Sequence, residues 1–456
     1  MSEMGKDLLL ILPQIIVLLT AVAALIWEMV RKPAGSLWSV VAGMLIAGGL
    51  SISRLGLQDT AFSHTFRIDQ LSHWAVIILS ISNILFVFLA RAELKNTERE
   101  GTVYSLLTFS ALGAMLLAGS GDLMFIVLGI LLVGLSGFAL AAYSKTDPAT
   151  EGAMKYFIYG SITGAIMTFG LTYWVGITGT TLISGLSQTN LPGWALSFGF
   201  ISLVIGIGYA ASFFPFHFWT PDTFQGSPVS IAAYLSVTPK IGAIFALAQV
   251  ARDLPVGIFD WQLIVVILAA FSMTFGNVLA LLQKNVVRLL AYSTVAQAGY
   301  FLLAIVAIPT ASEMANDALV VFGAAYAAMN TGAFALVLAY GKTIDELKGM
   351  SRSKPLAGIA LTIFLFSLVG IPPLAGFAGK LLLFSAVLEV EQVVLAVIAI
   401  LNSVLSLAVY LRIIIPLFYQ QPLEFTTINR SGFTRLVWLF CLVITLLLGI
   451  GVQFLL

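Results

Sequence analysis

The sequence SFFPFHFW at residues 212–219 and the sequence GIPPLAGFAGK at residues 370–380 interrupt two long apolar runs. Proline removes a backbone donor and clashes with the preceding helical turn. Inside lipid, such a break is tolerated only where the backbone is buried in protein or lines a cavity. A single proline kink is common in membrane helices, but interrupted helices at matching positions of two halves are typical of inverted-repeat transporters. The pair therefore predicts a repeat architecture with a site near the membrane midplane.

The composition supports a membrane protein. Of 456 residues, 60% are hydrophobic and 9% are charged, and the mean hydropathy is +1.03. Soluble domains carry about 25% charged residues, so this chain has too little polar surface to cover a soluble fold. A net charge of +1 argues against a nucleic-acid partner. The single cysteine, Cys441, excludes a disulfide framework and a cysteine-bound metal or iron–sulfur site.

The apolar pattern predicts an all-α, polytopic membrane protein with about 14 transmembrane helices, since a spanning helix needs about 20 mostly apolar residues. The first run ends in Arg31 and Lys32 without a cleavage pattern, so we expect a retained helix rather than a signal peptide. Short loops leave no room for a sizeable soluble domain. The predicted spans are 8–30, 36–54, 71–92, 104–120, 122–143, 153–178, 195–219, 228–251, 259–282, 286–308, 317–340, 355–389, 392–419 and 434–455.

Basic residues predict the orientation. If the N-terminus is outside, most Lys and Arg residues fall on inward loops, and only Lys6, Arg54, Arg67 and Arg252 fall on the outer side. The positive-inside rule then places both termini on the outer side. We expect a multi-pass protein of a bacterial plasma (inner) membrane; the sequence leaves a thylakoid or organellar membrane open.

Two lysines, Lys240 and Lys380, lie within predicted spans. A central lysine costs about 2.5–3.5 kcal/mol on insertion scales, so it persists where it lines a watery path or has a partner. Burial disfavours the charged form, which allows a buried lysine to exchange protons near neutral pH, as a relay requires. The alternative is that each side chain snorkels to an interface.

His217 follows Pro215 at the first break. Because histidine titrates near neutral pH, it is a candidate for a proton step. A structural hydrogen bond to an unwound carbonyl is the alternative. No His, Asp or Glu spacing in the chain predicts a metal site.

The segment PFHFWTPDTFQGSP at residues 215–228 resembles the junction of helices seven and eight in the antiporter-like subunits of respiratory complex I. Its Thr-Pro-Asp-x-aromatic-x-Gly-x-Pro form is similar to subunit N rather than to subunits L or M. The length also suits subunit N, because subunit L carries a long C-terminal lateral helix. The resemblance covers essentially the whole chain and extends to residues 154–160, 285–300, 370–380 and 402–412.

This resemblance implies two inverted five-helix repeats with broken helices 7 and 12. The implied divisions are a three-helix segment at 1–103, repeat 1 (helices 4–8) at 104–251, repeat 2 (helices 9–13) at 252–419, and helix 14 at 420–456. Lys240 would be the central lysine of helix eight, Lys380 the lysine of the exit half-channel, and His217 a further member of the proton relay.

The same resemblance implies a membrane-arm subunit of a proton-translocating complex I-type NADH:quinone oxidoreductase. The chain would hold no redox cofactor of its own. NADH, FMN, iron–sulfur clusters and quinone would bind partner subunits. The implied partners are lipids and M-, K-, L-, J-, A- and H-like subunits.

The chain departs from the family at a buried ion pair. Leu131 stands where the family has a helix-five glutamate, and Ala210 stands where it has a helix-seven lysine. Losing one partner of such a pair would leave an unpaired charge, at about 3–5 kcal/mol. Losing both predicts that the N-terminal half-channel is silenced as a unit. Gln14 likewise stands where the family often has a glutamate.

Three alternatives stay open. The chain could be a structural, non-pumping member of the arm, although the retained lysines argue against that. It could be a subunit of a Mrp-type cation/proton antiporter, against which the Thr-Pro-Asp segment argues. It could also belong to a membrane-bound hydrogenase or a ferredoxin- or deazaflavin-linked complex, because the electron donor is chosen by subunits other than this one.

Overall fold

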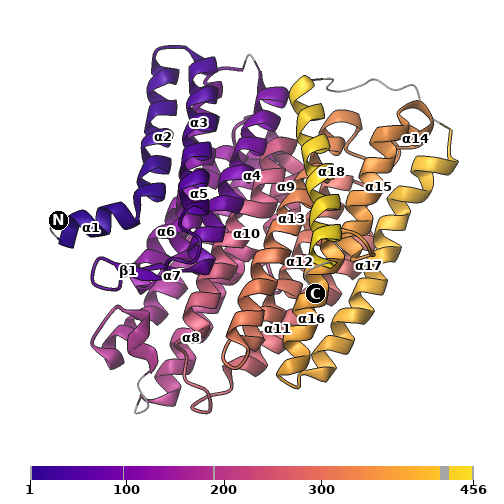
Figure 1. Cartoon of the computed structure of the whole chain (residues 1–456). Helices are drawn as coiled ribbons and strands as arrows, with labels where there is room; N and C mark the ends of the chain where they lie inside the picture. Colours follow the sequence, from indigo (N-terminus) through magenta and orange to yellow (C-terminus); the bar gives the residue numbers. More distant parts are fainter. Residues whose placement is uncertain (1–2, 96, 188–190, 422–430, 454–456) are drawn as a thin grey trace.

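The computed structural model describes residues 3–95, 97–187, 191–421 and 431–453. These residues form a bundle of long, roughly antiparallel helices with one small hairpin (Figure 1). The elements are α1 (Glu3–Leu10), α2 (Leu12–Met29), α3 (Pro33–Ile52), β1 (Asp59–Ala61), β2 (Phe66–Ile68), α4 (Gln70–Leu94), α5 (Glu100–Ala118), α6 (Leu123–Ala141), α7 (Asp147–Thr178), η1 (Ile183–Ser187), α8 (Gly193–Ala211), α9 (Thr220–Gly226), α10 (Val229–Ala251), α11 (Trp261–Leu281), α12 (Val286–Ala307), α13 (Ser312–Tyr340), α14 (Met350–Ser353), α15 (Pro355–Val369), α16 (Ala375–Glu389), α17 (Val393–Tyr419) and α18 (Gly432–Gln453).

Among the described residues, 12 helices are long and apolar enough to cross a membrane. The sixth predicted span is filled by α7, which has 32 residues but is more polar. The twelfth is shared by the shorter helices α15 and α16. The prediction of an all-α, multi-pass membrane protein is therefore confirmed, and each predicted span has a counterpart in the bundle.

Both predicted helix breaks are present and have the same local form. The last helical turns of α8 and α15 are each followed by a left-handed residue, Ser212 (φ 59°) and Gly370 (φ 95°). A cis peptide bond precedes Pro215 in the first break and Pro373 in the second. The chain then resumes as α9 and as α16. The prediction of broken helices 7 and 12 is confirmed.

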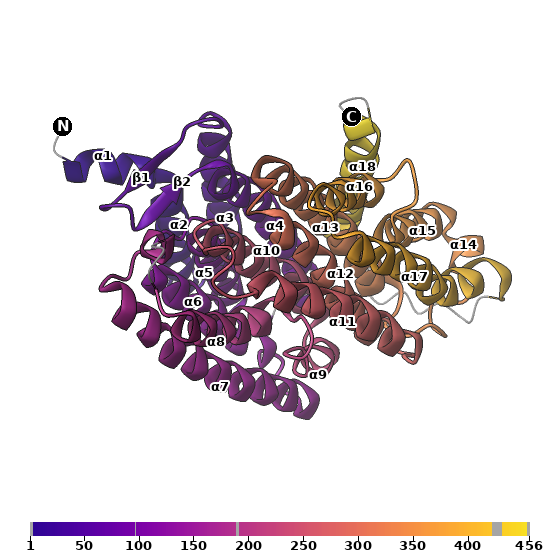
Figure 2. The same cartoon turned by 90° about the horizontal axis from the view of Figure 1, so that it is seen from below.

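Helix α10 lies at the centre of the bundle. All of its 23 residues are buried, and helices α4, α5, α8, α12 and α13 pack around it, as the view along the bundle shows (Figure 2). A residue on α10 is thus removed from lipid on every side. This position decides the surroundings of Lys240.

The two ends of the bundle differ in charge. The end at which α3, α5, α7, α10, α12, α15 and α18 begin, here called the basic face, carries most of the Lys and Arg residues. The opposite end, here called the acidic face, carries few cations, namely Lys6, Arg54, Arg67 and Arg252. Its acidic residues among those described are Glu3, Asp7, Asp59, Asp69, Asp122, Asp253, Asp260, Glu313, Asp317, Glu389 and Glu391.

Two local features differ from the sequence prediction. The first predicted span, 8–30, is divided: α1 is separate from α2, which has Pro13 in its first turn, where proline is favoured because its missing N–H has no helical acceptor. The hairpin of β1 and β2 was not predicted. Its strands have three residues each, with Thr60 opposite Arg67, and such short strands leave no readable alternation.

Candidate proton path

Lys240 is fully buried on α10 and reaches the first helix break. Its Nζ donates a hydrogen bond to the backbone oxygen of Ala211, the last residue of α8, at 2.9 Å. The last carbonyls of a helix have no partner within the helix, and a cation there is favoured by the helix dipole. Lys240 therefore satisfies a carbonyl that the break at Ser212 leaves open.

Lys380 makes the same kind of contact at the second break. Its Nζ donates to the backbone oxygens of Leu368 and Val369 at 3.1 and 2.9 Å, at the end of α15. It also donates to Ser403 Oγ at 3.3 Å and lies 3.8 Å from the centre of the Tyr300 ring. Each lysine thus holds the carbonyl end of the first half of a broken helix.

Neither lysine is at an interface. Lys240 is 0% exposed and Lys380 is 2% exposed, so burial excludes the snorkelling alternative. Within the described part of the chain, neither forms an ion pair with an acidic residue. Both cations rely on carbonyl and hydroxyl oxygens and, for Lys380, on an aromatic ring. A cation held this way can change its protonation without breaking an ion pair.

His217 lies between α8 and α9 and is buried among aromatic rings. Its ring stacks on Phe218 at 4.9 Å and lies 5.7 Å from Phe214 and 6.4 Å from Tyr292, measured between ring centroids. Its Nδ1 makes no hydrogen bond with any described residue. Lys240 reaches the same break through the backbone oxygen of Ala211, so both His217 and Lys240 lie at the first break.

A chain of polar side chains starts one turn before Lys240. Ser236 Oγ accepts a hydrogen bond from Asn330 Nδ2 of α13 at 2.6 Å, and the Ser236 backbone oxygen accepts one from Tyr326 at 2.8 Å. Asn330 and Tyr326 also hydrogen-bond each other at 3.3 Å. The Tyr326 ring in turn packs edge-to-face against Phe301 of α12, with the ring centroids 5.7 Å apart. These contacts link α10 to α12 through α13.

The series of polar side chains continues along α12 toward Lys380. Ser293 Oγ lies 2.6 Å from the hydroxyl of Tyr410, which is also next to Gln297. Gln297 Nε2 donates to the Leu368 backbone oxygen at 3.1 Å, and this same oxygen accepts from Lys380. Clusters of buried polar groups therefore lie between the two lysines, in the second half of the protein.

The sequence analysis missed the polar residues between the lysines. A usable signal exists: Ser293, Gln297 and Tyr300 lie at spacings of four and three on one face of α12, and Tyr326 and Asn330 are four apart on α13. Polar residues that share a face of an otherwise apolar membrane helix point to the bundle interior.

The first half of the protein has different packing. Leu131 on α6 is 53% exposed and lines an apolar cavity of about 480 Å³ between α6 and α7, whereas Ala210 on α8 is buried. The neighbouring core is aromatic: the rings of Tyr156 and Trp219 stack at 4.0 Å, and Tyr209 packs against both. No acidic or basic side chain is among the described residues that line this cavity.

Asp222 on α9 joins the two halves at the basic face. Its carboxylate accepts hydrogen bonds from Lys155 of α7 at 2.6 Å and from Arg288 of α12 at 2.5 Å. Burial opposes ionisation of Asp222, but these hydrogen bonds outweigh it and hold the pKa of the carboxyl below its ordinary value. The segment after the first break is thereby tied to helices of both halves.

Glu93 on α4 caps the helix that carries Lys240. Its two carboxylate oxygens accept hydrogen bonds from the backbone N–H groups of Val229 and Ser230, at 2.9 and 2.8 Å. A carboxylate at a helix N-terminus satisfies unpaired donors and is favoured by the helix dipole. Glu93 therefore fixes the start of α10. Nowhere in the described ranges do three or more His, Cys, Asp or Glu side chains come together to hold a metal ion.

Comparisons with known proteins agree with this geometry. A family model for the NADH:quinone oxidoreductase/Mrp antiporter transmembrane region matches residues 120–406. The chain is 35% identical to NADH-quinone oxidoreductase subunit N 1 of Streptomyces griseus, over 98% of this chain and 97% of that one. It is 34% identical to F(420)H(2) dehydrogenase subunit N of Methanosarcina mazei, over 91% and 90%.

A solved structure shows the same fold. A chain of respiratory complex I from Thermus thermophilus is 28% identical and superposes with a TM-score of 0.85, covering 96% of this chain and 97% of that one. The match therefore extends from the first spans to the last, including both helix breaks. The chain belongs to the NADH:quinone oxidoreductase/Mrp antiporter transmembrane family, in its subunit N branch.

Proposed function

We propose that this chain is the N subunit in the membrane arm of a proton-translocating, complex I-type NADH:quinone oxidoreductase. Full-length similarity to a subunit N and to a complex I chain supports this assignment. NADH, FMN, iron–sulfur clusters and quinone then bind partner subunits, and this chain contributes proton transfer. Its partners are the M-, K-, L-, J-, A- and H-like subunits of the same arm.

The contribution of this chain is a proton relay from Lys240 to Lys380. One observation carries the proposal: two buried lysines without acidic partners among the described residues hold the open ends of two broken helices, and buried polar side chains lie between them. Protonation of one lysine raises the free energy of a second nearby positive charge, so a proton at one site favours release at the next. His217 adds a titratable group beside Lys240.

The gaps between the polar side chains that lie between the two lysines are suited to water. Gln297 Oε1 and Thr331 Oγ1 are buried and have no hydrogen-bond partner among the described residues. Buried polar groups normally find a partner, and bound water supplies it where protein does not. Water at these atoms would complete a hydrogen-bonded path between the lysines, along which a proton can move.

The relay is confined to the second half of the protein, repeat 2 (252–419), together with α10. At Leu131 and Ala210 the chain has apolar groups, and the surrounding core is aromatic. This packing supports a first half, repeat 1 (104–251), whose half-channel is silent. A wholly structural subunit is less consistent with the contacts of Lys240 and Lys380, because each buries a cation that a hydrophobic residue could replace.

The charge distribution supports one orientation. The basic face carries most of the Lys and Arg residues and would lie on the cytoplasmic side by the positive-inside rule. Both termini would then lie outside a bacterial plasma membrane. A reduced deazaflavin is a second candidate for the electron source, because the Methanosarcina mazei relative is named an F(420)H(2) dehydrogenase subunit.

The relay is tested by Lys380→Met in the whole complex. Reconstituted vesicles would report protons moved per NADH oxidised, and a native gel would report assembly. We expect an assembled complex with a lower ratio, because methionine keeps the volume but removes the titratable group. Lys342→Met, an exposed position on the basic face, is the control and should leave the ratio unchanged. A normal ratio in Lys380→Met would leave only the structural role.

A further inference from the structure

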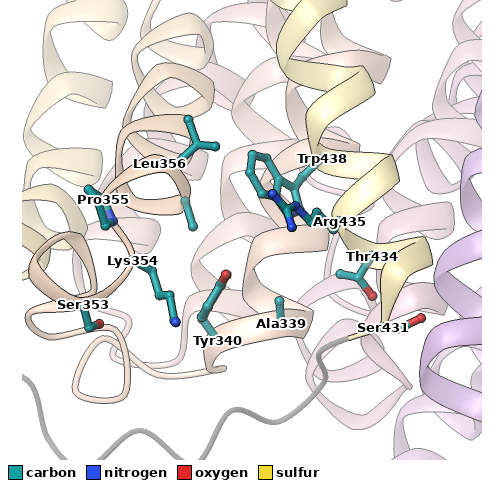
Figure 3. A pocket seen from close by; sticks show the side chains of 11 residues that line it. Ala339, Tyr340, Ser353, Lys354, Pro355, Leu356, Ser431, Thr434, Arg435 and Trp438 are labelled. Atoms are coloured by element: carbon teal, nitrogen blue, oxygen red, sulfur yellow. The ribbon is translucent and has the colours of Figure 1, made fainter.

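A cavity of about 480 Å³ opens at the basic face between α13, α15 and α18. Figure 3 shows Lys354 and Ser353 on one side, Thr434 and Arg435 of α18 on the other, and Tyr340 of α13 between them. Two cations thus face one concave site, and no acidic residue is among the described residues that line it. This arrangement suits an anion.

Neither cation is already engaged. Lys354 and Arg435 are exposed, and neither side chain forms an ion pair or hydrogen bond with a residue that the structure describes. Two helices, α15 and α18, also begin at this cavity. The first N–H groups of a helix lack helical acceptors and carry partial positive charge, which favours an anion beside them.

Thr434 provides an independent sign of a ligand. Its side chain is 1% exposed, lines the cavity, and its Oγ1 has no hydrogen-bond partner in the described chain. Leaving a hydroxyl buried without a partner is unfavourable by about 1–3 kcal/mol. A phosphate oxygen in the cavity would accept a hydrogen bond from this hydroxyl, which has no acceptor among the described residues.

Apart from Tyr340, Ser353 and Ser431, the rest of the cavity wall is apolar. Trp438 is nearly buried, whereas Leu356 on α15 is 51% exposed. Both helices run from this end into the membrane region, so an alkyl chain attached to the anion could lie along them. Tryptophan is itself enriched at the depth of the lipid headgroups. A free phosphate would use only the polar half of the site.

We propose that this cavity binds the phosphate of an anionic phospholipid, such as phosphatidylglycerol, with Lys354 and Arg435 as the charged contacts and Thr434 as a hydrogen-bond donor. Basic pockets between helices on the cytoplasmic side are known to suit lipid headgroups. The lipid would fill the space between α18 and α15. This site is independent of the proton relay.

The test uses the whole complex in phosphatidylcholine vesicles that contain a trace of photoactivatable phosphatidylglycerol. Mass spectrometry would map the cross-links, which we expect at the first turns of α15 and α18. Unlabelled phosphatidylglycerol should suppress labelling, whereas phosphatidylcholine and inorganic phosphate should not. If inorganic phosphate suppresses labelling as well as phosphatidylglycerol does, the site binds free anions and the lipid proposal is wrong.

Variants separate this site from general surface charge. Each cation next to an anionic lipid contributes about fivefold in affinity, so Lys354→Gln with Arg435→Gln should weaken labelling about 25-fold. Lys284→Gln with Lys342→Gln removes two exposed cations from the same face and should leave labelling unchanged. Thr434→Val should weaken labelling severalfold without loss of folding, since its hydroxyl has no partner in the described part of the chain. Wild-type labelling in both pocket variants would overturn the proposal.

Discussion

The substitution Asn330→Leu should lower proton translocation while it changes the stability of the protein only slightly. Asn330 is fully buried and donates to Ser236 Oγ at 2.6 Å and to the Tyr326 hydroxyl at 3.3 Å, while its own Oδ1 has no partner among the described residues. Leucine has nearly the same shape but no polar atoms. The substitution therefore cuts the polar chain between α10 and α12 without opening a cavity.

The stability change should be small. Two lost hydrogen bonds destabilise by about 0.5–1.5 kcal/mol each, whereas removing an unpartnered buried oxygen stabilises by about 1–3 kcal/mol. The former partners stay satisfied, because Ser236 Oγ still donates to Ala233 and Tyr326 still donates to the Ser236 backbone oxygen. The free energy of unfolding should thus change by less than about 2 kcal/mol in either direction.

The assay is proton translocation by the reconstituted complex, followed with a pH-sensitive dye as NADH is oxidised. Asn330→Leu should lower the protons moved per NADH while the complex assembles fully. The control is Asn83→Leu, since Asn83 is also buried, also has an unpartnered Oδ1, and donates to Thr108 of α5 instead. An assembled Asn330→Leu complex that pumps as well as Asn83→Leu would refute the polar path.

Two further predictions concern the helices that hold the path. Glu93→Ala should destabilise the start of α10 by about 0.5–2 kcal/mol, the usual loss for a helix cap, whereas Glu98→Ala should not; thermal unfolding of the purified complex measures both. Asp222→Asn should show a pH-dependent effect. The pKa of Asp222 is lowered in the folded protein, so its contribution is present above the unfolded value of about 3.9 and is lost as the pH falls through the folded pKa. Wild type should therefore have the higher Tm at neutral pH, and the difference should vanish in acid; a constant difference across this range would count against the ion-pair role.

Much of the fold was predictable because the bilayer imposes it. Long apolar runs must become spanning helices, and proline-containing breaks must be buried, so both breaks were found at Pro215 and Pro373. The start of α2 and the hairpin of β1 (Asp59–Ala61) and β2 (Phe66–Ile68) were not found. Their signals are local and short, and the apolar run at 8–30 hides the place where one helix ends and the next begins.

The site was predictable in part. A charged residue in an apolar span stands out, so Lys240 and Lys380 were identified, and both are buried at helix breaks. Their acceptors are backbone carbonyls, at Ala211 and Val369, whose exposure depends on where each helix breaks. No side-chain pattern encodes such a partner. The linking residues, such as Asn330 and Gln297, are neutral and come together only through packing of helices distant in sequence.

The most direct test of the relay is the ratio of protons moved to NADH oxidised in Lys240→Met, measured in vesicles with the wild-type complex alongside. Lys240 begins the path and is the buried lysine at the first break. The relay predicts a clear fall in this ratio while a native gel shows a fully assembled complex. An unchanged ratio in the assembled variant would contradict the relay and leave this chain a structural member of the membrane arm.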